Sequence, residues 1–184
     1  MTERPTLVVV SGPPGAGKTT LAHAVAKAVG CPAICRDEIK EGMVHATTGF
    51  VARPGDELTM RTLPTFFSVL QLLLSAGVTT VAEAAFQDRV WRPRLEPLRE
   101  LARMRIIQCC VDADVAWARI SQRQERYELR QAHADSHIGD TATHALGHNT
   151  FDRVYLDVPS IEVDTSDGYQ PGLDEIVQFV NSPH

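Results

Sequence analysis

Residues 11–20 read Ser11-Gly12-Pro13-Pro14-Gly15-Ala16-Gly17-Lys18-Thr19-Thr20, which contains the complete pattern G-x-x-x-x-G-K-T. An apolar run, Leu7–Val10, precedes this segment, and a helix-like stretch follows it. Glycines let the backbone curl so that successive N–H groups point at phosphate oxygens, and the positive end of the helix dipole adds to the attraction. The segment therefore predicts a phosphate-binding loop between a strand and a helix.

Two side chains at the end of this loop carry the chemistry expected of a nucleoside triphosphate site. The Lys18 ammonium is placed to reach the β and γ phosphates, and the Thr19 hydroxyl is placed to bind Mg²⁺. A glycine-rich turn with a chance lysine is the alternative, but the strand before the loop and the helix after it argue against that interpretation. The residues expected to bind the nucleotide are Gly12, Pro13, Pro14, Gly15, Ala16, Gly17, Lys18, Thr19 and Thr20.

Around the loop, short apolar runs alternate with longer helix-like stretches, a pattern typical of a parallel sheet covered by helices. The expected strands are Thr6–Val10, Ala33–Cys35, Val78–Ala82, Arg105–Cys110 and Ser160–Val163. The expected helices are Lys18–Val29, Asp37–Thr48, Asp56–Ser75, Arg92–Ala102, Ala113–Gln131 and Leu173–Val180. A chain of 184 residues provides one α/β core and too little for two. We therefore predict a single three-layer P-loop NTPase domain over residues 1–184, with a five-stranded parallel sheet flanked by helices.

The composition argues against other classes of protein. With 18 Lys and Arg against 23 Asp and Glu, the net charge is −5, so no sequence-wide basic field would attract a nucleic acid. The apolar runs are far shorter than the ~20 residues that a bilayer span needs, so no membrane partner is expected. The N-terminus leads into the first strand without a signal-like segment, which predicts a cytoplasmic protein.

The four cysteines are Cys31, Cys35, Cys109 and Cys110, and no C-x-x-C pair occurs among them. We expect reduced thiols that pack as small apolar side chains. The alternative is a metal site in which Cys31 and Cys35 act with some of the 7 His, although no ligand spacing resembles a zinc module.

Signatures of other phosphate-binding proteins are missing from the sequence. A regulatory GTPase would carry D-x-x-G and N-K-x-D, and neither string occurs. A motor or transporter ATPase would normally require a much longer chain. The remaining class is a small kinase, in which one domain holds the acceptor next to the γ-phosphate.

The second strand ends in Cys35-Arg36-Asp37, at the edge of the sheet where open α/β proteins bind their ligands. Asp37 is thus placed to accept a proton from an acceptor hydroxyl. The alternative is a structural role for Asp37 as the N-cap of a helix, because a helix-like stretch follows it. The two roles are compatible.

The P-loop followed by Arg36-Asp37-Glu38-Ile39 resembles the kinase domain of polynucleotide kinase and, more broadly, chloramphenicol phosphotransferase and the zeta-toxin-type sugar-nucleotide kinases. The resemblance implies that Asp37 is the general base and that Arg36 faces the acceptor. It also implies that Glu83, after the third strand, either holds a Mg²⁺-bound water or orients the acceptor; a buried structural carboxylate is the alternative. Residues 37–75 would form the acceptor-side cap, which differs among these families.

Four arginines, Arg119, Arg123, Arg126 and Arg130, follow one another at spacings of 4, 3 and 4 residues. At about 100° per residue they fall within roughly 60° of one another on a helix, which makes one face strongly cationic. A solvated face is the alternative, but a polyphosphate would offset the repulsion more directly. In small P-loop kinases this position is the lid. The resemblance thus implies a lid over residues 119–149, in which Arg119 binds nucleotide, Arg123 and Arg126 are catalytic and Arg130 binds substrate.

Two further features fit an acceptor site. Arg89 could contact an anionic acceptor, although a loop arginine is more often solvated. Four histidines follow the arginines and fit acceptor contact or a flexible surface better than a metal site, because no acidic or cysteine pattern accompanies them. They are His133, His137, His144 and His148.

These predictions converge on a kinase that uses Mg²⁺ and either ATP or GTP to phosphorylate the hydroxyl of a small molecule, such as an antibiotic, a nucleoside or a sugar. One alternative is a polynucleotide 5′-hydroxyl kinase, which the net charge and the lack of interleaved basic and aromatic residues weaken. The other is a non-catalytic module that responds to nucleotide, in which Asp37 merely caps a helix.

Overall fold

The computed structural model describes residues 4–126 and 148–183; for residues 123–126 it describes the helical backbone only. The strands are β1 (Thr6–Ser11), β2 (Ala33–Cys35), β3 (Thr80–Glu83), β4 (Arg103–Cys110) and β5 (Ser160–Asp164). The helices include α1 (Lys18–Val29), α2 (Arg36–His45), α3 (Glu57–Ser75), α4 (Asp88–Leu95), the 3₁₀ helix η1 (Glu96–Glu100), α5 (Ala113–Arg126) and α7 (Leu173–Asn181).

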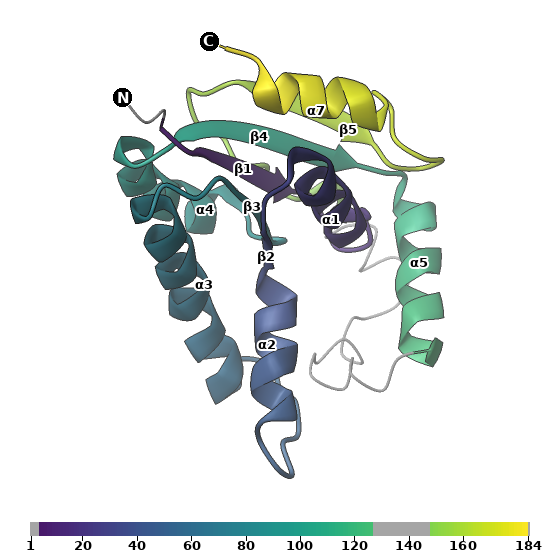
Figure 1. The fold of residues 1–184 in the computed structure, drawn as a ribbon. Coiled ribbons are helices and arrows are strands. Elements are labelled where there is room, and N and C mark those ends of the chain that lie inside the picture. Colours follow the sequence, from purple (N-terminus) through teal and green to yellow (C-terminus); the bar gives the residue numbers. More distant parts are fainter. Residues whose placement is uncertain (1–3, 127–147, 184) are drawn as a thin grey trace.

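The five strands form one sheet with the order β2-β3-β1-β4-β5, and every pairing is parallel (Figure 1). The central strand, β1, pairs with β3 on one side and with β4 on the other, so that Leu7 aligns with Thr80 and Met104. This topology confirms the predicted five-stranded parallel sheet flanked by helices. It also places the loop after β1 at the middle of the carboxyl edge of the sheet.

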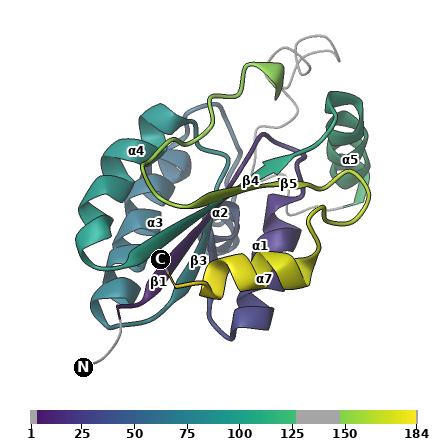
Figure 2. The ribbon, with the colours of Figure 1, turned by 90° about the horizontal axis from the view of Figure 1, so that it is seen from above.

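Helices cover both faces of the sheet, and alternate residues of β1 serve the two layers (Figure 2). Val8 and Val10 pack with buried residues of α1 and α7, whereas Leu7 and Val9 pack with those of α3 and α4. Because both faces are covered, β1 is apolar throughout rather than alternating. Even α3, with 19 residues the longest of the described helices, does not meet the length and apolarity of a membrane span, and neither does any other described helix.

The main departure from the predicted elements lies between β3 and β4. A single helix was expected over 92–102, but α4 begins at Asp88 and gives way to the 3₁₀ helix η1 at Glu96. Pro97 lies in the first turn of η1 and has no N–H to donate. The predicted helix over 37–48 ends at His45, and residues 127–131 of the predicted fifth helix lie outside the described chain.

A buried ion pair joins α2 to the start of α3 within the predicted acceptor-side cap. The Lys40 ammonium lies 2.9 Å from the Asp56 carboxylate, and the side chains are only 3% and 8% exposed. Asp56 also caps α3 by accepting a hydrogen bond from the Thr59 N–H at 2.7 Å. Burial alone would raise the pKa of Asp56, but the Thr59 N–H and the Lys40 charge outweigh it and lower this pKa to about 2.

Replacing Asp56 with Asn is expected to destabilise the fold, because Asn can still cap α3 but leaves the Lys40 charge buried without its counterion. We expect a loss of about 3 kcal/mol of unfolding free energy at neutral pH. A carboxylate with a depressed pKa stabilises the fold above its ordinary pKa of about 4. The difference between wild type and Asp56→Asn should therefore shrink as the pH falls below about 4 and vanish only below about 2, as urea unfolding would measure.

Asp112→Asn is the matched control for this prediction. Asp112 stands before α5, is exposed and accepts a hydrogen bond from the Asp114 N–H at 2.8 Å, so it resembles Asp56 in its local role. The described structure gives it no buried lysine partner. A loss of equal size in both variants would show that a negative charge at the helix N-terminus, rather than the Lys40 ion pair, stabilises this region.

Candidate active site

The loop between β1 and α1 has two positions that only glycine fits. Gly12 has a φ of 152° and Gly15 a φ of 81°, both in the region that L side chains rarely adopt. A Cβ atom on Gly12 would lie 2.5 Å from the carbonyl oxygen of Cys109, and one on Gly15 would lie 2.6 Å from that of Ala116. The loop therefore packs closely against β4 and α5, which fixes its curled shape.

Lys18, the first residue of α1, folds back over this loop. Its ammonium donates a hydrogen bond to the Pro13 carbonyl at 2.9 Å, and the side chain is buried. The cation thus lies within the curl of the loop. This is the location expected for a lysine that meets the β and γ phosphates of a nucleotide.

Glu83 ends β3 directly beside the loop. In the sheet it aligns with Val10 of β1 and Cys35 of β2, so it stands between the phosphate loop and the acceptor-side strand. Its carboxylate accepts a hydrogen bond from the Thr19 hydroxyl at 3.1 Å. The side chain is buried, and this burial raises the pKa of Glu83, an effect that the Lys18 charge partly offsets.

The Thr19–Glu83 pair fits a magnesium site. A hydroxyl and a carboxylate lie side by side, and oxygen atoms are the ligands that Mg²⁺ prefers. A cation beside Glu83 would also stabilise the ionised carboxylate that burial disfavours. Of the two roles expected for Glu83, the contact with Thr19 favours that of holding a Mg²⁺-bound water.

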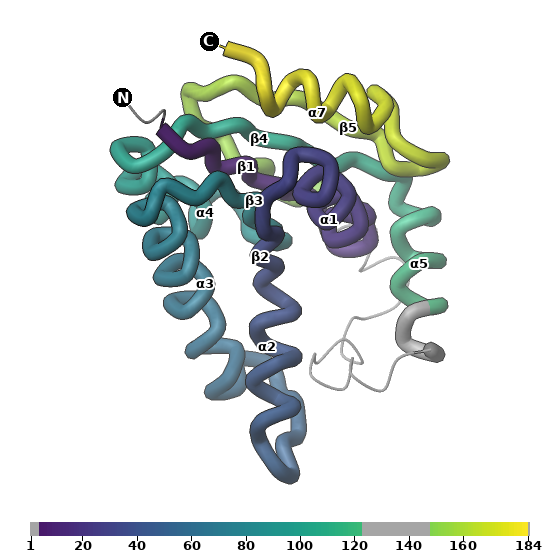
Figure 3. The backbone as a smooth tube through the Cα atoms, viewed as in Figure 1, coloured from purple at the N-terminus to yellow at the C-terminus, as the bar shows by residue number. Residues whose placement is uncertain are grey.

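Asp37 lies in the first turn of α2, next to the end of β2. The strand runs directly into the helix without a connecting loop (Figure 3), and α2 begins at Arg36 with Cys35 as its N-cap. The suggestion that Asp37 caps this helix is therefore wrong. Its carboxylate accepts a hydrogen bond from Arg36 at 2.8 Å, and its side chain is 52% exposed. The charge of Asp37 also contributes to the raised pKa of Glu83, after burial.

An aromatic cluster borders the same side of the sheet. Phe86, three residues after Glu83, lies 5.2 Å from Trp91 and 6.1 Å from Phe67, measured between ring centroids. Phe86, Phe67 and Ile39 of α2 are only partly buried and pack against the α3–α4 core. The Trp91 indole N–H donates to the Ser11 hydroxyl at 3.1 Å, which ties this cluster to the end of β1.

On the other side of the loop, Arg119 of α5 is held by the turn after β5. Its guanidinium donates to the carbonyl oxygens of Thr165 and Ser166 at 2.6 and 3.1 Å. This arrangement borders a hollow of about 290 Å³. Its lining residues are Gly17, Thr20, Arg119, Thr165, Gly168 and Tyr169. The hollow adjoins the phosphate loop through Gly17 and Thr20. It therefore lies where the rest of a nucleotide would extend from phosphates bound to the loop.

The structure brings some of the predicted site residues together, whereas others lie outside its described part. The loop residues 12–20, Glu83 and the pair Arg36–Asp37 lie together at the carboxyl edge of the sheet. Arg89 is exposed on α4. The backbone of Arg123 and Arg126 belongs to α5, but their side chains lie outside the described part of the structure, as do Arg130, His133, His137 and His144. The lid over residues 119–149 therefore stays a prediction.

Sequence reasoning missed Trp91 and Tyr169 in this region, as well as the contacts that Thr165 makes. Trp91 anchors the start of the loop and Thr165 holds Arg119, while its hydroxyl also donates to the Ala16 carbonyl at 3.1 Å. These contacts join residues more than 40 positions apart, so no local pattern could have indicated them.

Comparison with known proteins gives a consistent result. Residues 7–145 match the family model described as "AAA domain". No curated protein sequence matches the chain. Among solved structures, the chain is similar to a protein from Chloroflexus aurantiacus J-10-fl that is provisionally described as a kinase, with a TM-score of 0.80 and 25% identity over 97% of both chains.

Two more distant structures share the fold. One is the Mycobacterium tuberculosis APS kinase CysC in complex with AMPPNP and APS, with a TM-score of 0.62 and 14% identity over 97% of this chain and 99% of that one. The other is shikimate kinase from Acinetobacter baumannii in complex with shikimate, with a TM-score of 0.52 and 19% identity over 96% and 90% of the two chains.

Proposed function

Because the chain belongs to the AAA domain family and shares the fold of small P-loop kinases, we propose that it transfers the γ-phosphate of a nucleoside triphosphate to a hydroxyl of a small molecule. One observation carries the proposal. A phosphate loop with its lysine, a hydroxyl–carboxylate pair suited to Mg²⁺ and an accessible aspartate lie along one edge of the sheet, at or just after the ends of the neighbouring strands β1, β3 and β2. A protein that only binds nucleotide would not need Asp37 there.

The donor occupies the phosphate loop in this proposal. The N–H groups of Gly15 and Gly17 and the Lys18 ammonium bind its β and γ phosphates, and the hollow beside Arg119 holds its nucleoside. Mg²⁺, when bound, would be held by Thr19 and, directly or through water, by Glu83, and it would neutralise charge on the β and γ oxygens. The hollow is lined by glycine, threonine, arginine and tyrosine residues, a lining compatible with either ATP or GTP.

The acceptor lies on the side of β2 and β3. Asp37 accepts the proton of the acceptor hydroxyl as its oxygen forms a bond to the γ phosphorus. The bond from that phosphorus to the β–γ bridging oxygen breaks at the same time, and the nucleoside diphosphate leaves. Arg36 holds the carboxylate in place through its 2.8 Å hydrogen bond.

The partly buried side chains of Ile39, Phe67 and Phe86 supply an apolar border on this side. They favour an acceptor that presents an apolar face beside its hydroxyl group, because such a surface gains by leaving water. Arg123 and Arg126 are proposed to stabilise the transferring phosphoryl group, as the arginine spacing predicts. Arg130 and Arg89 are proposed to contact the substrate.

The test is a screen for phosphoryl transfer with the purified full chain. MgATP and MgGTP would be supplied with panels of hydroxyl-bearing antibiotics, nucleosides and sugars, and with a 5′-hydroxyl oligonucleotide. We expect one small-molecule class to gain the mass of one phosphoryl group, with an equal amount of nucleoside diphosphate formed. Phosphorylation of the oligonucleotide alone would show that the acceptor is a polynucleotide rather than a small molecule. Tight nucleotide binding with no product from any panel would contradict the proposal.

A further inference from the structure

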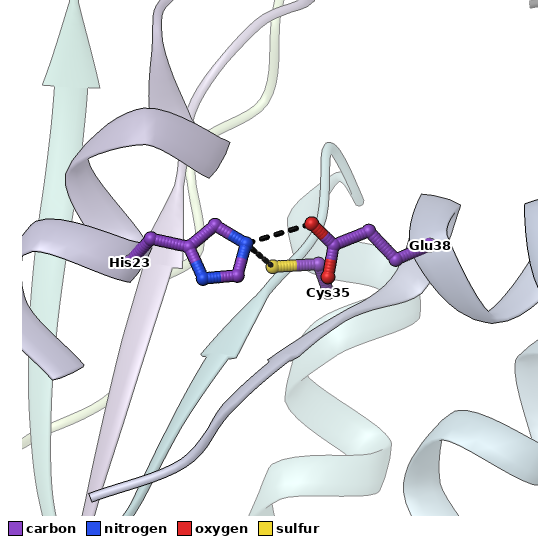
Figure 4. Close-up of side chains that lie close together, drawn as sticks. All are labelled: His23, Cys35 and Glu38. Carbon is purple, nitrogen blue, oxygen red and sulfur yellow. Dashed lines mark hydrogen bonds and ion pairs between the residues drawn. The ribbon is translucent and has the colours of Figure 1, made fainter. Parts of the chain in front are cut away.

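Three potential metal ligands from three elements meet where α1, β2 and α2 adjoin. They are His23 of α1, Cys35 at the end of β2 and Glu38 in the first turn of α2. Their ligand atoms all lie within 4.8 Å of one another. Figure 4 shows the imidazole of His23 pointing at both the Cys35 sulfur and the Glu38 carboxylate.

The distances are close to those that a metal ion requires. The His23 Nε2 atom lies 3.7 Å from the Cys35 Sγ atom. In a tetrahedral zinc site, with bonds of about 2.3 Å to sulfur and about 2.0 Å to nitrogen, these two atoms are about 3.5 Å apart. His23 Nε2 and Glu38 Oε1 are hydrogen bonded at 2.7 Å and would have to separate by about 0.6 Å. Both side chains are about half exposed, so they have room to do so.

The surroundings favour a cation and leave it a way in. Cys35 is buried, but His23 and Glu38 are 50% and 47% exposed, so the side of the cluster that they form opens to solvent. The Glu38 carboxylate supplies negative charge that attracts a cation, and a bound cation favours the thiolate form of Cys35.

We propose that His23, Cys35 and Glu38 form a binding site for a divalent transition metal ion, with Zn²⁺ as the ion that this ligand set fits best. Nitrogen and sulfur ligands exclude Mg²⁺ and Ca²⁺, which prefer oxygen, and three protein ligands leave a fourth position for water. On binding, the thiol proton leaves to solvent, and the imidazole coordinates through Nε2 as the neutral tautomer that carries its proton on Nδ1.

The proposed site lies between two helices, so a bound ion would link them. His23 belongs to the helix that starts at Lys18, whereas Glu38 follows Asp37 on α2. An ion held between them would fasten the nucleotide-side helix to the acceptor-side helix. The site is separate from the Thr19–Glu83 pair, because none of its three ligands belongs to that pair.

Cobalt(II) is a suitable probe, because coordination by a thiolate gives a sulfur-to-metal charge-transfer band. The full chain, without an affinity tag and in excess Mg²⁺, would be titrated with Co²⁺, and Zn²⁺ would then be used to displace it. We expect one equivalent of Co²⁺ to produce the band and one equivalent of Zn²⁺ to abolish it. Zinc should also raise the thermal unfolding midpoint, because it binds only the folded site.

Variants would assign the ligands. Cys35→Ser should remove the band, and His23→Gln and Glu38→Gln should each weaken Zn²⁺ binding by at least about tenfold, since even outer partners of metal ligands have effects of that size. Cys31→Ser and His45→Gln, which change the same residue types outside the cluster, should leave the band and the affinity unchanged. His23→Gln alters an exposed side chain, so it tests the site even if Cys35→Ser fails to fold. A band retained in Cys35→Ser, or zinc affinity unchanged in His23→Gln, would overturn the proposal.

Discussion

Replacing Asp37 with Asn is expected to reduce phosphoryl transfer by about 10²-fold or more while the protein stays folded. The amide keeps the size of the side chain and an oxygen that can accept the Arg36 hydrogen bond, which is 2.8 Å long in the wild type. It cannot accept the proton of an acceptor hydroxyl. The loss should appear in kcat with the acceptor saturating, as measured by formation of nucleoside diphosphate.

The stability of this variant is informative because Asp37 does not cap α2; Cys35 holds that position. Asn at position 37 loses the attraction between a negative charge and the helix N-terminus, worth roughly 0.5 kcal/mol. It also loses the charge of the ion pair with Arg36, which contributes little because the Asp37 side chain is half exposed. Glu41→Gln, one turn further along α2, is the matched control and should keep its turnover. If Asp37→Asn turned over at the wild-type rate, Asp37 would have no role as a base.

The fold was largely predictable because its signals are local. The apolar runs correspond to all five strands, and the parallel arrangement follows from their alternation with helices. Errors occur where tertiary packing overrides a local pattern. Val78 and Thr79 read as strand, yet β3 begins at Thr80, because the backbone turns through Gly77 with a φ of 77°. Asp37 has the appearance of an N-cap, but β2 enters α2 so directly that Cys35 takes this position.

The residues of the candidate site also fall into those that a local pattern identifies and those that only tertiary structure brings together. The phosphate loop is contiguous, so its residue types and spacing identify it without a structure. The pairing of Thr19 with Glu83 spans 64 positions and depends on the register of β1 and β3, which the sequence does not state. The cluster of His23, Cys35 and Glu38 has no zinc-module spacing at all, because three different elements supply its ligands. The metal site considered from the sequence combined Cys31 with Cys35. Only Cys35 belongs to the cluster in the structure.

Lys18→Ala is expected to have an effect as large as that of Asp37→Asn, but at the donor. The Lys18 ammonium is the buried cation of the phosphate loop, where it donates to the Pro13 carbonyl and lowers the raised pKa of Glu83. Without it, charge developing on the transferring phosphoryl group loses a preorganised donor. Removal of one such donor typically reduces kcat by about 10²- to 10³-fold. Unlike Asp37→Asn, this variant should also bind the nucleotide more weakly, since the lysine meets the phosphates before transfer as well as during it.

Two measurements separate these effects. Isothermal titration with a non-hydrolysable MgATP analogue reports donor binding, and steady-state turnover reports transfer. Lys27→Ala is the matched control, because Lys27 lies on the same helix but is exposed and remote from the loop, in the last turn of α1. Lys18→Ala should lower both quantities, Asp37→Asn turnover alone and Lys27→Ala neither. Unchanged analogue affinity together with unchanged turnover in Lys18→Ala would refute the assignment of residues 12–20 as the donor site, because no other described lysine contacts this loop.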